Sequence, residues 1–259
     1  MRGALIRPVF LCFHEMSLKV TEFFQEFKRV MFENGRFDFI IDGLKNTFLI
    51  TLGSLILGIA LGVIVAVVRS TYDKNHSHLK KTGGFSYYLF SFFNAICQLY
   101  LTVIRGTPVV VQLMIFYFVI FASTDNGVLV ATLAFGINSG AYVAEIFRSG
   151  IMAVDNGQFE AGRSLGLNYA QTMWHIVIPQ AFKNILPALG NEMITLLKDT
   201  SLVSVISLRD ITKQAQNIAN KTYQAFIPYI SLALIYLVIV IIMTKLLSVL
   251  ERRLRKGDH

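Results

Sequence analysis

Two long apolar runs limit what this chain can fold into. Residues 48–68 and residues 226–244 contain no Asp, Glu, Lys or Arg. Each run is about as long as the ~20 residues that a helix needs to cross the ~30 Å hydrocarbon core of a bilayer. In a water-soluble fold, two helices without a polar face would have to be buried on every side. We therefore expect an all-α integral membrane protein.

Composition and charge agree with this expectation. The chain has 259 residues, of which 54% are hydrophobic and 15% are charged, whereas soluble domains have about 45–50% and about 25%. The net charge of +8 is spread over the ends of the apolar segments, as the positive-inside rule requires. We therefore expect a lipid bilayer as partner and no nucleic acid. Cys12 and Cys97 show no metal-site or disulfide spacing, so we expect no metal site.

We expect five transmembrane helices. The apolar region 85–124 is too long for one span, and the sequence RGTP at 105–108 interrupts it, because proline disfavours helix at the residue before it. This break predicts an interfacial helix at 86–104 followed by a crossing. The five expected crossings are residues 44–68, 107–122, 127–146, 183–206 and 226–249.

The expected domain organisation is an N-terminal arm over 1–43, a transmembrane domain over 44–250 and a basic tail over 251–259. Lys and Arg residues are frequent in the tail and in the loop expected at 69–84, so both are predicted to face the cytoplasm. The linker 123–126, which has no Lys or Arg, then lies outside.

The pair Gly58 and Gly62 on the first expected crossing indicates a helix-packing face. Small residues four positions apart lie on one side of a helix and let a neighbouring backbone approach closely.

A moderately polar insert at 149–178 is predicted to form two short helices on the cytoplasmic side. Asp155 can cap the first helix, with Gln158 three positions on to complete a capping box. Gly166 suits the left-handed position that closes a helix.

The second helix of the insert is predicted to begin after Asn168, which has Gln171 three positions on. Pro179 is expected to end it. Two short helices with a tight corner between them resemble a docking surface for a cytoplasmic partner.

Ionisable side chains lie inside the third and fourth expected crossings, where each costs roughly 2.5–3.5 kcal/mol at a helix centre, and such residues are therefore functional candidates. Helical spacing places them in two polar stripes that could line a path for a zwitterionic solute. Alternatively, Lys198 forms an ion pair with Glu145 or Glu192 that only holds the bundle together. The candidate path residues are Asn138, Tyr142, Glu145, Glu192, Thr195 and Asp199.

Residues 160–179 resemble the EAA motif of ABC-importer permeases, which reads EAA, three residues, G, nine residues, I, any residue, L, P. Gly162 stands where the family has a second alanine, and Ile178 stands where it has leucine. Residues 103–118 and 191–207 are similar to the polar amino-acid branch of the same family.

This resemblance covers about residues 37–255 and implies a type I ABC importer permease: the transmembrane subunit of an ATP-driven importer for polar amino acids in the bacterial cytoplasmic (inner) membrane. It implies two ABC ATPase subunits, a second permease copy or sister permease, and an extracytoplasmic amino-acid-binding protein as partners. In the family the EAA loop forms a coupling helix that sits in a cleft of the ATPase. The corresponding residues are Glu160, Ala161, Gly162, Arg163 and Gly166.

The chain has no Gly-x-x-x-x-Gly-Lys-Ser/Thr phosphate loop. We therefore expect a transport subunit that is not an enzyme and binds no cofactor, with ATP on a partner chain. A stand-alone channel or ion-driven carrier and a membrane-embedded enzyme are the alternatives. The sequence leaves open which amino acid is carried, whether the dimer is homomeric or heteromeric, and whether translation starts at Met1 or Met16.

Overall fold

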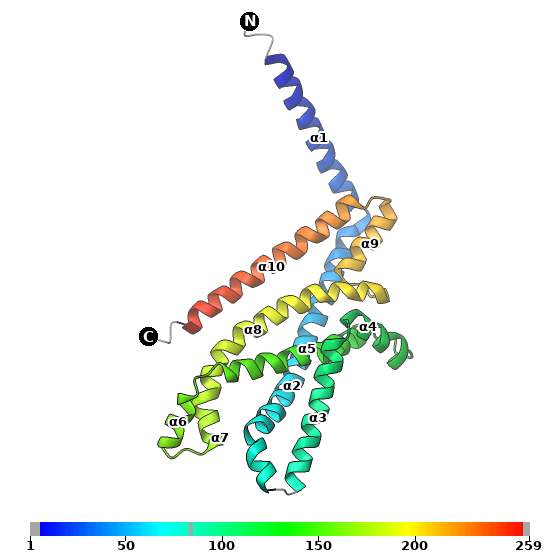
Figure 1. Cartoon of the computed structure of the whole chain (residues 1–259). Helices are drawn as coiled ribbons and strands as arrows, with labels where there is room; N and C mark the ends of the chain where they lie inside the picture. The colour runs from blue at the N-terminus through cyan, green and yellow to red at the C-terminus, as the bar shows by residue number, and fades with distance from the viewer. Residues whose placement is uncertain (1–5, 83–84, 256–259) are drawn as a thin grey trace.

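The computed structural model describes the backbone of residues 6–82 and 85–255 and the side chains of residues 19–73 and 87–254 (Figure 1). Every secondary-structure element in these ranges is a helix, which confirms the all-α prediction. The α-helices are α1 (Ile6–Phe32), α2 (Arg36–Thr82), α3 (Phe85–Gly106), α4 (Val109–Ile115), α5 (Gly127–Met152), α6 (Gly157–Ser164), α7 (Tyr169–Thr172), α8 (Ile178–Asp199), α9 (Ile211–Thr222) and α10 (Phe226–Arg255).

Four helical stretches in the described part of the chain are long and apolar enough to cross a membrane. They are Lys19–Asp73, Tyr87–Gly106, Gly127–Met152 and Phe226–Leu254. The second of them corrects the sequence prediction, which made 86–104 interfacial and placed the crossing at 107–122.

The segment after RGTP is too short to cross. It forms α4, of seven residues, and a five-residue π-helix at Phe116–Ile120, which together span about 18 Å at 1.5 Å per residue. Pro108 interrupts the helical run as predicted: its backbone is extended, and it directly precedes the first residue of α4.

The crossing expected at 183–206 corresponds to α8 and a 3₁₀-helix at Thr200–Ile206. Helix α8 carries four charged side chains and is not among the four stretches above: they are Lys183, Glu192, Lys198 and Asp199. The count of five crossings therefore stays a prediction.

Close packing between α2 and α5 forms the centre of the molecule. A methyl group at Gly58 would lie 2.9 Å from Ser139 Oγ, and one at Gly62 would lie 2.5 Å from Val143 Cγ1. The Ser54 hydroxyl also donates to the backbone carbonyl of Thr132 at 3.2 Å. The small-residue packing face predicted on the first crossing is confirmed.

A second junction attaches α9 to α2 through Asp210. Its buried carboxylate accepts hydrogen bonds from the backbone N–H groups of Thr212 (3.0 Å) and Lys213 (2.8 Å) at the start of α9. Gly43 of α2 packs on it so closely that a Cβ there would lie 2.8 Å from the Asp210 carbonyl. Burial raises the pKa of the Asp210 carboxyl, and the two N–H groups act in the opposite direction.

The segment expected to be a basic loop at 69–84 is mostly helical, because α2 continues to Thr82 and α3 begins at Phe85. The end of α2, the start of α3 and the α6–α7 insert lie at the same end of the molecule in Figure 1. This agrees with the expectation that the segment 69–84 and the insert face the same side, the cytoplasm.

Replacing Gly62 with alanine should destabilise the α2–α5 contact by about 1–3 kcal/mol, the usual cost of overpacking. The added methyl would approach the Ala144 backbone nitrogen to 2.9 Å as well as the Val143 side chain. We expect a lower unfolding temperature for the detergent-solubilised protein. Ala60→Val, which enlarges an exposed residue of the same helix, is the control. Equal unfolding temperatures for Gly62→Ala and the wild type would contradict the tight packing.

Candidate functional site

A cavity of about 460 Å³ lies between the RGTP corner, the start of α4 and the facing sides of α5 and α8. We call it the first cavity. Five of the six residues that the sequence placed on a solute path line it, so the two polar stripes face each other in space. These five are Asn138, Tyr142, Glu192, Thr195 and Asp199.

The carboxylates of Glu192 and Asp199 give the first cavity an acidic wall on α8. Glu192 is half-buried, and its Oε1 accepts a hydrogen bond from the Ser139 hydroxyl at 2.7 Å. Within the described side chains, neither carboxylate has an ion-pair partner within 4.0 Å, and Lys198 is exposed. The alternative in which Lys198 pairs with Glu145 or Glu192 is therefore not observed.

Gln112 holds the RGTP corner against α5. Its amide nitrogen donates to the carbonyl of Ile104 (2.8 Å) and to the Thr107 hydroxyl (2.7 Å), while its carbonyl accepts from Asn138 Nδ2 (3.0 Å). Sequence reasoning missed this residue. The signal was a single amide in the otherwise apolar run VVVQLMIFYF, where a buried polar group needs partners.

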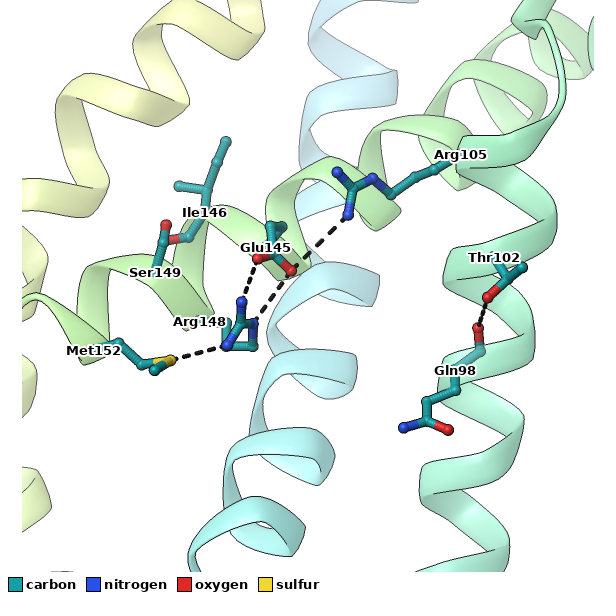
Figure 2. Close-up of polar contacts among 8 residues, drawn as sticks. All are labelled: Gln98, Thr102, Arg105, Glu145, Ile146, Arg148, Ser149 and Met152. Carbon is teal, nitrogen blue, oxygen red and sulfur yellow. Dashed lines mark hydrogen bonds and ion pairs between the residues drawn. The ribbon is translucent and has the colours of Figure 1, made fainter.

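Glu145, the sixth predicted path residue, lines a neighbouring cavity and not the first one. Its carboxylate contacts Arg148 through Oε1 (2.6 Å) and Oε2 (3.2 Å) and lies 4.0 Å from Arg105 Nη1 (Figure 2). The Arg105 guanidinium also lies 5.7 Å from the centre of the Tyr142 ring. Glu145 thus has ion-pair partners, which Glu192 and Asp199 lack within the described side chains.

The corner of the predicted insert forms as expected. Gly166 has a φ of 78°, the left-handed conformation that favours glycine. Asn168 caps α7 with a full capping box, in which Asn168 Oδ1 accepts from the Gln171 N–H and Gln171 Oε1 accepts from the Asn168 N–H, both at 2.9 Å. Both predictions are confirmed.

The two outer boundaries of the insert differ from the prediction. Helix α6 begins at Gly157, and Asp155 Oδ1 accepts from the Gly157 N–H at 2.6 Å, two positions on, so no capping box forms with Gln158. Pro179 does not end the second helix. A π-helix at Met173–Val177 leads into α8, which places the proline in the first turn of α8, where a missing N–H costs little.

Gly162 fixes how α6 and α7 pack. A Cβ at this position would lie 2.6 Å from both Thr172 Cγ2 and Oγ1, so the departure from the EAA pattern has a steric reason here. The rings of Phe159 and Tyr169 stack across the same contact, with centroids 6.2 Å apart. A buried cluster joins the insert to α8, and its residues are Val154, Val177, Ala181 and Ile185.

The outer surface of the insert is open. Four of the five predicted coupling residues are exposed, namely Glu160, Ala161, Arg163 and Gly166, whereas Gly162 is buried. Two large apolar side chains project beside them: Leu165 is 76% exposed and Trp174 is 69% exposed. Such apolar groups on a corner away from the bundle are typical of a protein–protein contact.

Relatives match more than four fifths of the chain. It is 38% identical to the arginine transport system permease protein ArtQ of Bacillus subtilis over 85% of this chain and 94% of the relative. It is 34% identical to the glutamine transport system permease protein GlnP of Escherichia coli over 83% and 93%.

Solved structures agree on the fold. The crystal structure of an amino acid ABC transporter with histidines superimposes with a TM-score of 0.73 at 41% identity, covering 83% of this chain and 94% of that one. The MetNI methionine ABC transporter in an inward-facing conformation gives a TM-score of 0.69 over 86% and 99%. At 16% identity this second match supports the fold alone.

The family described as "Binding-protein-dependent transport system inner membrane component" matches residues 82–256. With the α-helical bundle and its protruding insert, these matches confirm the resemblance drawn from the EAA motif. The chain has the fold of type I ABC importer permeases and belongs to the family of binding-protein-dependent transport system inner membrane components.

Proposed function

We propose that this chain is the permease subunit of an ATP-driven importer for polar amino acids. The observation that carries the proposal is the first cavity, where five predicted path residues meet and two carboxylates have no ion-pair partner within the described side chains. Relatives that carry arginine and glutamine in their names support the substrate class.

The ammonium group of an amino acid fits the acidic wall of the first cavity. A half-buried carboxylate without a cationic partner attracts a cation more strongly than an exposed one, because less water screens it. Glu192 is held in place by the Ser139 hydroxyl, so the site is formed before the solute arrives. We assign Glu192 and Asp199 to ammonium binding, with Asn138 and Thr195 as polar neighbours.

The insert is proposed to dock on a cytoplasmic ATPase. Glu160 lies in the first turn of α6, where a carboxylate is favoured by the helix dipole and can meet a basic group of the partner. Two of the helices that line the first cavity lead into this insert: α5 ends at Met152, and α8 continues the helical run from Tyr169. A movement of the insert would therefore displace the cavity walls.

The remaining partners follow from the family. We propose two ABC ATPase subunits, a second permease copy or a sister permease, and an extracytoplasmic amino-acid-binding protein, in the bacterial inner membrane. ATP hydrolysis takes place on the ATPase subunits, and this chain binds no cofactor itself.

Glu160→Lys should weaken binding to the ATPase by roughly tenfold or more, because the substitution places like charges together at the dock. A tagged pull-down from mild detergent measures ATPase retention, and uptake into proteoliposomes measures ATP-dependent transport. Asp155→Asn is the matched control, since it removes a nearby exposed acid but keeps an oxygen that can accept from the Gly157 N–H. Equal ATPase retention by Glu160→Lys and this control would refute the docking role.

Glu192→Gln should reduce ATP-dependent amino-acid uptake by roughly tenfold, the effect of losing one charge-assisted contact to the ammonium group. ATPase retention should stay at the wild-type level, because the residue is remote from the insert. Asn191→Ala alters the neighbouring exposed side chain outside both cavities and should leave uptake unchanged. Wild-type uptake by Glu192→Gln would remove this residue from the path.

A further inference from the structure

The cavity that contains Glu145 has no role in the function proposed above. It has a volume of about 640 Å³ and lies between α2, α3 and α5, within the range of ~300–1,000 Å³ of small-molecule sites. We call it the second cavity. Its polar lining residues are Arg69, Gln98, Thr102, Arg105, Tyr142 and Glu145.

The two cavities adjoin. Arg105, Gly106 and Tyr142 line both of them. On α5, Asn138 lines the first cavity and Glu145 lines the second. Glu145 lies about two helical turns closer to the insert that follows this helix. The second cavity therefore lies on the side of the first that is expected to face the cytoplasm.

The second cavity has an excess of positive charge. Among the described side chains that line it, Arg69 and Arg105 are cationic and Glu145 is acidic. The guanidinium group of Arg148, one turn further along α5, pairs with the Glu145 carboxylate at 2.6 Å. Two cations of the lining thus stand against one carboxylate, which already has a partner of its own.

Two of the three guanidinium groups have unused donors. Arg148 is committed, because it holds Glu145 through contacts of 2.6 and 3.2 Å (Figure 2). The Nε of Arg69 is buried and has no hydrogen-bond partner among the described residues. Arg105 contacts the Glu145 carboxylate at 4.0 Å and the Tyr142 ring, whose centre lies 5.7 Å away. Its side chain is 45% exposed, so the ion pair with Glu145 is weak and can exchange.

We propose that the second cavity binds the α-carboxylate of the solute, with Arg69 and Arg105 as the binding groups. This proposal rests on the proposed amino-acid import. Arginine is suited to the task because its planar fork of N–H groups matches a carboxylate. The solute would leave the acidic wall of the first cavity and pass Arg105 and Tyr142, and its carboxylate would replace Glu145 as the partner of Arg105.

Substituting Arg69 distinguishes carboxylate binding in the second cavity from binding in the first, because Arg69 lines only the second cavity of the two. The test uses the permease–ATPase complex in lipid nanodiscs without a binding protein. Binding of radiolabelled L-arginine and L-glutamine is measured, with agmatine, the decarboxylated form of arginine, as competitor. The readout is the affinity ratio of L-arginine to agmatine, which a general loss of folded protein does not change.

We expect the wild-type complex to prefer L-arginine over agmatine, and Arg69→Gln to reduce this preference roughly tenfold, the effect of one lost charge-assisted contact. Arg69→Lys should restore part of it. Arg209→Gln removes an exposed cation outside both cavities and should keep the wild-type ratio.

An unchanged ratio in Arg69→Gln, together with loss of L-arginine binding in Glu192→Gln, would overturn the second site and leave the proposed function intact. A wild-type complex that binds neither amino acid would overturn both proposals.

Discussion

The close contact between α2 and α5 fixes the position of one wall of both cavities. Gly58 and Gly62 let the two backbones approach until side chains of α5 lie where a Cβ of α2 would be. Within a bilayer this packing matters more than apolarity, because lipid tails are as apolar as the helices themselves. Asn138, Tyr142 and Glu145 therefore sit on a helix that is held rigidly, and their spacing along it determines which cavity each one lines.

The opposite wall of the first cavity is α8, and it is physically connected to the insert. The helical run that begins at Tyr169 passes through the π-helix and Pro179 into the segment that carries Glu192 and Asp199. Gly162 and Thr172 lock the two halves of the insert together. A displacement of the insert by a partner bound around Glu160 would thus move α8 and with it the wall of the first cavity.

Much of this arrangement could be predicted from local sequence. Charge-free runs indicated the apolar spans, and Gly166 and Asn168 indicated the corner of the insert because their backbone and capping chemistry is local. The predicted position of the crossing near RGTP was wrong, because both flanking segments are apolar and the sequence does not show that the helix after Pro108 ends at Ile120. The prediction that Pro179 ends the second helix of the insert was wrong, because the π-helix at Met173–Val177 leads into α8 and places this proline in the first turn of α8. Two features could not be predicted from local sequence, because they depend on contacts between distant segments. One is the role of Gln112 at the RGTP corner, and the other is the position of Glu145 outside the first cavity.

Access to α8 from the two sides of the membrane tests the link between insert and cavity most directly. Thr195→Cys, with Cys12 and Cys97 replaced, would be labelled by a membrane-impermeant thiol reagent in the reconstituted permease–ATPase complex. The account predicts that adding ATP changes the side from which this position reacts, and that Glu160→Lys abolishes the change. Labelling from the same side with and without ATP in the otherwise unaltered complex would contradict it.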